Sequence, residues 1–304
     1  MKRLLLIICS LFICSAAMHA QEACDTIYIN MPDGNVAKYN VHNIDSITFV
    51  PHTIKAEQPT PGTTTQMGAA ISWIDDDFKV FDNSGELLPI YKTVHDWCIE
   101  KDIRYDFATI TRTGTNYINI IKQWEEEGFN FLMHPTHTGW YNYKDENVHD
   151  IVLVRKYFIT NMRFFNTNIA SAKRRILVWP GSSNSFPENV DFVSQYVECA
   201  ITATTVGSNP GTVNDRYQLK RLSLYLSSSM TKTQLKNLIK QYVDNGDWVI
   251  LYTHLYNHKN TDVVDETTNS VANLMEIVEY ANSLCPLRST ESVWSERKKL
   301  YDKQ

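Results

Sequence analysis

From Ala69 onward, short apolar runs alternate along the chain with longer segments of helical periodicity. The apolar runs have the length of strands and are hydrophobic on both faces, which is typical of parallel strands covered by helices. We predict strands at 69–74, 103–110, 129–133, 174–179, 199–204, 221–226 and 247–253, and helices at 87–101, 116–128, 146–168, 190–198, 231–246 and 269–284. This pattern indicates an α/β domain.

The length of this region decides between two α/β architectures. Roughly 235 residues (70–304) fit a distorted (β/α) barrel better than a small open sheet. A doubly wound sheet remains the alternative. Either fold places the carboxyl ends of its strands at one edge, where functional side chains gather.

The N-terminus has the pattern of an export signal. Lys2 and Arg3 precede an apolar run at 4–14, and the small residues of "SAAMHA" follow it. The run is too short to span a bilayer. We predict a signal peptide at 1–20 and a protein that works in the periplasm, at the cell surface or outside the cell. Lipid attachment through Cys24 is the less favoured alternative.

Between the signal and the barrel, the sequence predicts a small β module and a linker. Residues 25–50 alternate apolar and polar around "PDGN", which indicates a hairpin, with a further short strand at "SITFV". The module at 21–50 resembles one found near the N-terminus of many secreted bacterial surface proteins. The Pro/Thr/Gly-rich stretch at 51–68 is predicted to be a linker, and 69–304 the barrel domain.

Charge and cysteine content exclude some classes of function. A net charge of -5 with mixed signs provides no basic face for nucleic acid. After signal removal four cysteines remain, scattered and without a CxxC pair, so a cysteine zinc cluster is not expected. Disulfides and buried free thiols both remain open for Cys24, Cys98, Cys199 and Cys285.

Polar residues follow four of the predicted strands. In chain order they are Asp75, Asp76 and Asp77, then His134 and His137, then Pro180 and Gly181, and finally His254. An Asp with two His is a common set of ligands for a divalent metal. A second Asp can act as a base on water, and a third His as the acid that protonates a leaving group. The set suits metal-assisted hydrolysis of an acyl bond.

These residues lie in four motifs that resemble those of the polysaccharide deacetylases of the NodB-homology type. "SWIDDDFK" resembles the family's strand ending "TFDDG", and "GFNFLMHPTH" resembles "GHEI(A/G)(S/N)H(S/T)xxH". "LVWPGSSN" resembles loosely a strand ending "YPxG" or "RPPxG", and "NGDWVILYTH" resembles the last strand, which ends in His. The motifs occur in the family's order and extend from about Ala69 to the C-terminal helix. The resemblance implies a metal-dependent carbohydrate esterase on a distorted (β/α) barrel.

The resemblance also implies a role for each residue. Asp75 would be the catalytic base, Asp76 and His134 metal ligands, and His254 the general acid. Backbone N–H groups near Pro180 and Gly181 would stabilise the oxyanion.

Three departures from the family pattern leave alternatives open. The second histidine of the motif falls at Thr138, so His137, one residue short, is the nearest candidate for the third ligand. If His134 is the N-cap of a short helical turn, His137 lies at N3 and the two rings can converge. The triple Asp also allows Asp76 and Asp77 as the base and ligand pair. The arginine of the third motif is Val178 here, and Arg221, at another strand, is a candidate to supply the positive charge instead.

The predicted partner is an acetylated polysaccharide or oligosaccharide, and the predicted cofactor a divalent metal, zinc by default. Trp140 and Tyr141 follow the histidines and are candidates for stacking on a sugar ring. The irregular histidine spacing and the missing arginine leave a second hypothesis, a catalytically impaired relative that binds glycan at the cell surface. Another acylated substrate, such as a peptide, remains a third.

Overall fold

The computed structural model describes residues 26–30, 36–40, 67–112, 114–135, 151–169, 176–181, 187–210 and 215–301. The chain forms two compact units, Met1–Gln58 and Pro59–Gln304. The predicted signal peptide, Cys24 and the short strand at 46–50 lie outside the described residues.

The first unit contains a β-hairpin. Strand β1 (Thr26–Asn30) pairs antiparallel with β2 (Val36–Asn40), with Ile27 opposite Tyr39. The hairpin predicted on either side of "PDGN" is therefore confirmed.

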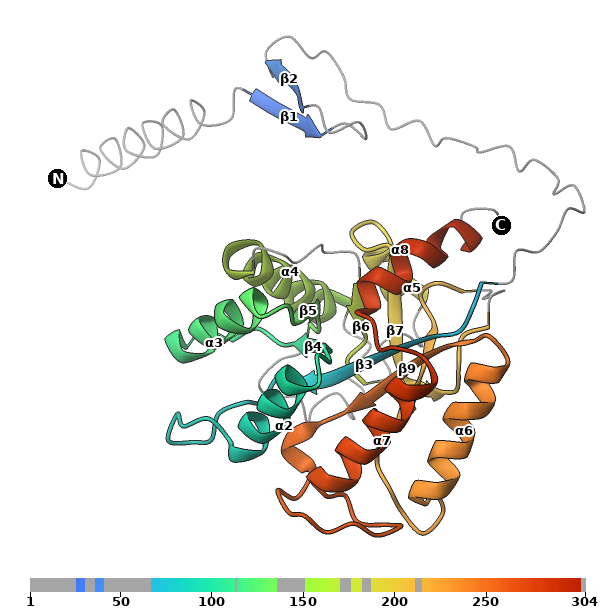
Figure 1. Ribbon diagram of the computed structural model, residues 1–304. Coiled ribbons are helices and arrows are strands. Elements are labelled where there is room, and N and C mark those ends of the chain that lie inside the picture. Colours follow the sequence, from blue (N-terminus) through green and yellow to red (C-terminus); the bar gives the residue numbers. More distant parts are fainter. Residues whose placement is uncertain are drawn as a thin grey trace, which may run out of the picture. The chain divides into compact units, whose positions relative to one another are not determined.

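The second unit is a closed barrel of parallel strands (Figure 1). Its strands, in barrel order, are β3 (Ala70–Asp77), β4 (Asp106–Thr109), β5 (Asn130–Met133), β6 (Ile176–Val178), β7 (Cys199–Val206), β8 (Leu219–Ser223) and β9 (Trp248–Thr253). Strand β9 pairs with β3 over six residues, from Ala70 opposite Trp248 to Asp75 opposite Thr253, and so closes the barrel. The predicted (β/α) barrel is confirmed, and closure excludes the doubly wound sheet.

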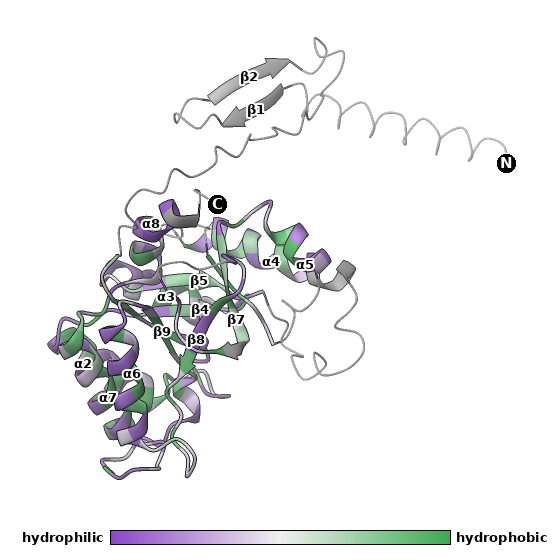
Figure 2. Ribbon diagram, turned by 90° about the vertical axis from the view of Figure 1, so that its right-hand side faces the viewer, coloured by the Kyte–Doolittle hydropathy of each residue, from purple (hydrophilic) through white to green (hydrophobic). Residues whose placement is uncertain are grey.

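Helices surround the barrel. They are α2 (Pro89–Glu100), α3 (Thr115–Glu126), α4 (Ile151–Asn168), α5 (Pro187–Val193), α6 (Lys232–Asp244), α7 (Val271–Leu284) and α8 (Thr290–Tyr301), with the 3₁₀ turn η6 (Leu255–Asn257) after β9. Figure 2 shows mostly hydrophobic strands, whereas the helices mix hydrophilic and hydrophobic residues. Among the described residues, no helix combines the length and hydrophobicity that crossing a membrane requires.

Residues along each strand alternate between the barrel interior and the helix layer. One hydrophobic cluster takes residues from all seven strands, including Ile74, Leu132, Val178, Leu219 and Ile250, and must therefore fill the interior. The other cluster contains the alternate strand residues together with the helices that cover them. This period of two follows from the pleat of a strand.

Helix α8, which the sequence analysis did not predict, covers the amino-terminal end of the barrel. Its Val293 and Trp294 join the interior cluster. The Thr290 N–H at the start of the helix donates to Asp106 Oδ2 at the start of β4 (2.6 Å). This end of the barrel is therefore closed by apolar packing, and the opposite end holds the polar residues.

Candidate functional site

The alternation along β3 separates the three aspartates. Even-numbered Ala70 and Ile74 belong to the interior cluster, and odd-numbered Ile71 and Trp73 to the outer one. Asp76 therefore faces the interior and Asp75 the helices. Neighbouring carboxylates that look equivalent in the sequence thus lie in different environments.

Asp75 is fully buried, and both of its carboxylate oxygens accept hydrogen bonds. Tyr91 Oη of α2 donates to Oδ2 (2.8 Å), and the Leu255 N–H donates to Oδ1 (2.6 Å). Burial raises the pKa of Asp75 well above its usual value, although both hydrogen bonds act in the other direction. Asp75 therefore joins β3, α2 and the turn η6 that follows β9.

Asp76 is paired with Arg221, which β8 also directs into the barrel. Arg221 Nη1 donates to Asp76 Oδ2 (2.5 Å), and both side chains are buried. The guanidinium lies 3.9 Å from the centroid of the Tyr252 ring, a cation–π contact that fixes its plane. Asp76 Oδ1 is buried and has no hydrogen-bond partner within the described parts of the chain. Asp76 therefore has an acceptor oxygen to spare.

Asp77 ends β3 in a left-handed backbone conformation, with φ of 73°, and Phe78 follows at 47°. Consecutive non-glycine residues in this region are costly, and such strain concentrates at functional sites. The turn brings Asp77 Oδ1 to 3.3 Å from His134 Nε2, and Tyr256 Oη donates to Asp77 Oδ2 (2.8 Å). Although burial raises the pKa of Asp77, His134, His254 and Tyr256 together hold it well below its usual value.

His134 follows β5 and is buried. Its Nδ1 donates to the Val178 carbonyl oxygen at the end of β6 (2.8 Å), which sets the tautomer and leaves Nε2 facing Asp77. Burial lowers the pKa of His134, but the Asp77 and Asp76 carboxylates outweigh it, so this pKa lies above its usual value. Nε2 can therefore carry a proton toward Asp77 or offer its lone pair to a metal ion.

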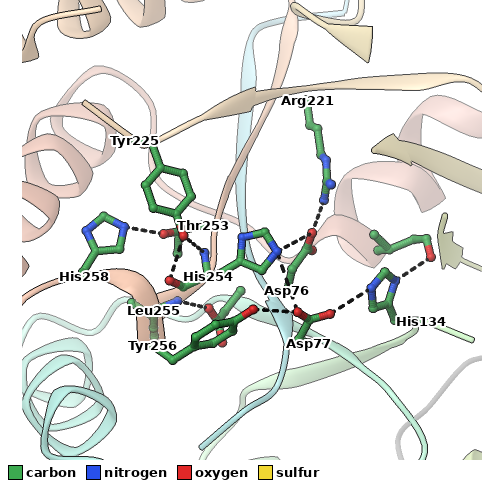
Figure 3. Close-up of polar contacts among 12 residues, drawn as sticks. Asp76, Asp77, His134, Arg221, Tyr225, Thr253, His254, Leu255, Tyr256 and His258 are labelled. Carbon is green, nitrogen blue, oxygen red and sulfur yellow. Dashed lines mark hydrogen bonds and ion pairs between the residues drawn. The ribbon is translucent and has the colours of Figure 1, made fainter. Parts of the chain in front are cut away.

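His254 comes directly after β9 and keeps part of its side chain in solvent, 21% of it exposed. Its Nε2 lies 3.8 Å from Asp76 Oδ2 and 3.9 Å from Asp77 Oδ2. Figure 3 shows the His254 ring beside both carboxylates, with His134 beyond Asp77 and Arg221 beyond Asp76. The arrangement places a partly exposed imidazole beside the buried carboxylate of Asp76 and the partly buried carboxylate of Asp77.

The other predicted residues fall into two groups. Pro180 is buried and Gly181 half-buried at the carboxyl end of β6, with φ of 53° at Gly181 and open space among the described atoms where a Cβ would stand. His137, Trp140 and Tyr141 lie outside the described residues, so their predicted roles stay predictions.

Three tyrosines of this region received no individual role in the sequence analysis. Tyr91 and Tyr256 bond to Asp75 and Asp77, and Tyr225 Oη bonds to the backbone of His254. Of these three tyrosines, only Tyr256 could have been singled out from the sequence, because it lies two residues after a motif histidine and is one of several aromatic residues near the motif ends. Trp73 and Trp179, two other aromatic residues near the motif ends, are buried in the core.

Asp77 and His134 suit a divalent metal by donor type. A carboxylate and an imidazole are a usual pair of metal ligands. A hydrogen bond from the other imidazole nitrogen to a backbone carbonyl usually orients such a histidine. Within the described residues, however, no group of three or more His, Cys, Asp or Glu side chains is arranged to hold a metal ion. The third predicted ligand, His137, is not among those residues.

The cysteines add no ligand or crosslink in the described part of the chain. Cys98 and Cys199 are buried free thiols, and Cys285 is a partly buried one.

Neither the protein-family models nor the curated proteins compared with this chain give a match. Among solved structures, a family 4 acetyl xylan esterase from Clostridium thermocellum, with a cobalt ion, is 14% identical, covers 74% of this chain and 90% of its own, and has a TM-score of 0.47. The Xyl-CE4 domain of a multidomain xylanase from the hindgut metagenome of Trinervitermes trinervoides is 10% identical, covers 77% and 92%, and scores 0.46.

A third similar structure is BA3943 from Bacillus anthracis, described as a CE4 family pseudoenzyme. It is 10% identical, covers 74% of this chain and 65% of its own, and has a TM-score of 0.44. With identities of 10–14% and TM-scores of 0.44–0.47, these likenesses carry no weight in assigning the chemistry. The chain is thus similar to structures of family 4 carbohydrate esterases, the class of protein that its four motifs resemble.

Proposed function

We propose that this chain is an exported, metal-dependent hydrolase that removes acetyl groups from a polysaccharide or oligosaccharide. The observation that carries the proposal is the placement of Asp76 and His254. A buried carboxylate, oriented by Arg221, lies beside a partly exposed imidazole at the carboxyl end of the barrel strands. A base and an acid in one site are what hydrolysis of an acyl bond requires.

Asp76 acts as the base, which is the second of the two registers that the sequence allows. Its buried Oδ1 has no partner among the described residues, so it can accept a proton from water. Arg221 balances its charge and, through Oδ2, holds its orientation. Asp75, by contrast, has both oxygens engaged and faces the helices.

His254 acts as the acid. Its partly exposed ring can reach a substrate that approaches from solvent, and Asp76 and Asp77 lie within 4 Å to stabilise the imidazolium. Donation of its proton to the departing sugar nitrogen or oxygen completes the hydrolysis.

Asp77 and His134 would hold the divalent metal, with His137 as the third predicted ligand and zinc as the default ion. When bound, such an ion would polarise the acyl oxygen and lower the pKa of a water molecule. The backbone N–H groups near Pro180 and Gly181 stabilise the oxyanion, and Trp140 and Tyr141 stack on the sugar.

The test is hydrolysis of a chromogenic acetyl ester and of acetylated sugar oligomers by the exported form of the protein. We expect activity that a chelator abolishes and zinc restores, and loss of both bound metal and activity in Asp77→Ala. The exposed Asp262→Ala is the matched control and should retain both. A wild-type protein that binds no metal and releases no acetate contradicts the proposal.

A second candidate function, glycan binding without catalysis, is supported by the contacts of Asp77. Both of its oxygens already have protein partners, His134 and Tyr256, so this cluster can be stable without an ion. Metal analysis and titration calorimetry with acetylated oligosaccharides distinguish the two. Glycan binding by a metal-free protein with no hydrolysis supports the binding protein, and stoichiometric metal with turnover supports the enzyme.

A further inference from the structure

The residues around His254 are held individually by partners from other parts of the fold. Thr253 Oγ1 shares a hydrogen bond with His258 Nε2 (2.7 Å). The Leu255 N–H donates to Asp75 Oδ1 (2.6 Å). The His254 backbone bonds to Tyr225 Oη through both its N–H and its carbonyl group. The segment that carries the candidate acid is therefore fixed on both sides.

Burying the carboxyl group of Asp75 to accept from a backbone N–H has a large free-energy cost. A carboxyl group buried among the helices costs free energy unless hydrogen bonds satisfy it, and a carbonyl oxygen could accept from Leu255 at less cost. Here Tyr91 satisfies the second oxygen, so the carboxylate joins α2 to the residue directly after His254. The cost indicates that the position of this peptide matters.

Tyr225 holds the other side of the same residue. Its hydroxyl donates to the His254 carbonyl oxygen (3.0 Å) and accepts from the His254 N–H (3.2 Å). Burial raises the pKa of Tyr225 to about 12, so the hydroxyl keeps its proton at neutral pH. The Tyr225 ring also stacks on His258, with centroids 5.0 Å apart. Figure 3 shows Tyr225 and His258 on the side of His254 away from Asp77.

We propose that Asp75 and Tyr225 are positioning residues, which fix the backbone of His254 so that its ring stays beside Asp76 and Asp77. The proposal rests on the proposed function, in which His254 is the acid. Neither residue needs to touch the substrate. A displacement of about 1 Å in a catalytic group can lower the rate about 10²-fold. Loss of these backbone hydrogen bonds is therefore expected to affect kcat more than KM.

The decisive experiment compares Asp75→Asn with Asp75→Ala in the full chain. Asparagine keeps an oxygen for the Leu255 N–H and an amide group that can donate to Tyr91 Oη. We expect Asp75→Asn to retain kcat within about threefold and Asp75→Ala to lose about 10- to 100-fold in kcat at unchanged KM. If Asp75→Asn loses as much activity as Asp76→Asn, Asp75 is the base and the proposal is overturned.

Hydrogen exchange at the Leu255 amide measures, independently of activity, whether Asp75 fixes this part of the backbone. The amide should exchange slowly in wild type and Asp75→Asn and rapidly in Asp75→Ala. Equal protection in all three proteins overturns the proposal even if the enzyme is active. If wild type releases no acetate but protection of the Leu255 amide depends on Asp75, the proposed function fails, whereas the positioning of the backbone by Asp75 is supported. Should Asp75→Ala not fold, Tyr91→Phe, which removes one hydroxyl, replaces it, with partial loss of protection expected.

Tyr225 is tested by Tyr225→Phe, which removes only the hydroxyl. We expect kcat to fall about tenfold with KM unchanged, because the His254 backbone loses both of its bonds to Tyr225, while its carbonyl oxygen keeps the bond from the Asn257 N–H. Tyr217→Phe is the matched control, since Tyr217 Oη also bonds to a backbone carbonyl, that of Val197, away from the site. Equal kcat in the two variants overturns the role of Tyr225.

Discussion

The two ends of the barrel each bury a carboxylate, and their surroundings differ. At the amino-terminal end, Asp106 accepts from the Thr290 N–H and from Asn130 Nδ2 (3.2 Å), so each oxygen has a partner. At the carboxyl-terminal end, Asp76 bonds to Arg221 through one oxygen, and the other has no partner within the described residues. The comparison suggests that satisfied groups serve the fold and that spare hydrogen-bonding capacity serves chemistry.

The backbone and the packing differ in the same way. At the amino-terminal end, α8 inserts Val293 and Trp294 among apolar residues. At the opposite end, β3 ends in two residues with left-handed backbone conformation, Asp77 and Phe78, beside the polar cluster. Backbone strain and polar groups therefore occur together at one end, and apolar packing closes the other.

The largest expected effect comes from removing the charge of each carboxylate in turn. Asp76→Asn should lower kcat/KM about 10³-fold, because the general base is lost. Asp106→Asn should leave kcat/KM close to wild type. Acetate release from one acetylated oligosaccharide measures both, and similar activity in the two variants would remove the distinction between the ends.

Trp294→Ala tests the closed end. Its fully buried indole packs with the barrel interior and donates to Glu198 Oε2 (2.9 Å). Truncation should lower the free energy of unfolding by about 3–5 kcal/mol. The molecules that remain folded should keep their kcat. Denaturant unfolding and active-site titration check this, and a loss of kcat at unchanged stability would contradict it.

Asp106 should also make stability depend on pH. Burial raises its pKa to about 6, above the value of 3.8 for the unfolded chain. The folded protein therefore holds this proton more tightly, so the contribution of Asp106 to stability falls as the pH rises from about 4 to about 6. Relative to wild type, Asp106→Asn should gain on the order of 3 kcal/mol between pH 4 and 7, from about two pKa units. A constant difference in unfolding free energy across these pH values would refute this assignment.

The smallest expected effect is that of Arg221→Lys. Lysine keeps the charge but loses the planar group that lies on Tyr252 and orients Asp76. We expect kcat to fall about tenfold, because the base is less well oriented. The exposed neighbour Lys220→Ala is the control. If Arg221→Lys behaves like that control, orientation by Arg221 has no role in the site.

The architecture could be predicted from the sequence because it depends on local pattern. Apolar runs on both strand faces, separated by amphipathic helices, predicted the parallel barrel, and the residues after those runs led to Asp76, His134 and His254. Helix α8 escaped prediction because its sequence is mostly polar, although it buries the apolar side chains of Val293 and Trp294.

The roles within the aspartate triplet depended on tertiary structure. Because both faces of β3 are apolar, the sequence does not show which residues point into the barrel; closure of β3 on β9 decides it. Arg221 lies 145 residues from Asp76, and the Leu255 amide 180 residues from Asp75. A barrel with acidic and imidazole groups at its strand ends could be deduced from the sequence alone. Only the folded chain decided which carboxylate is held fast and which has an oxygen to spare, because hydrogen bonds between distant segments exist only after the barrel closes.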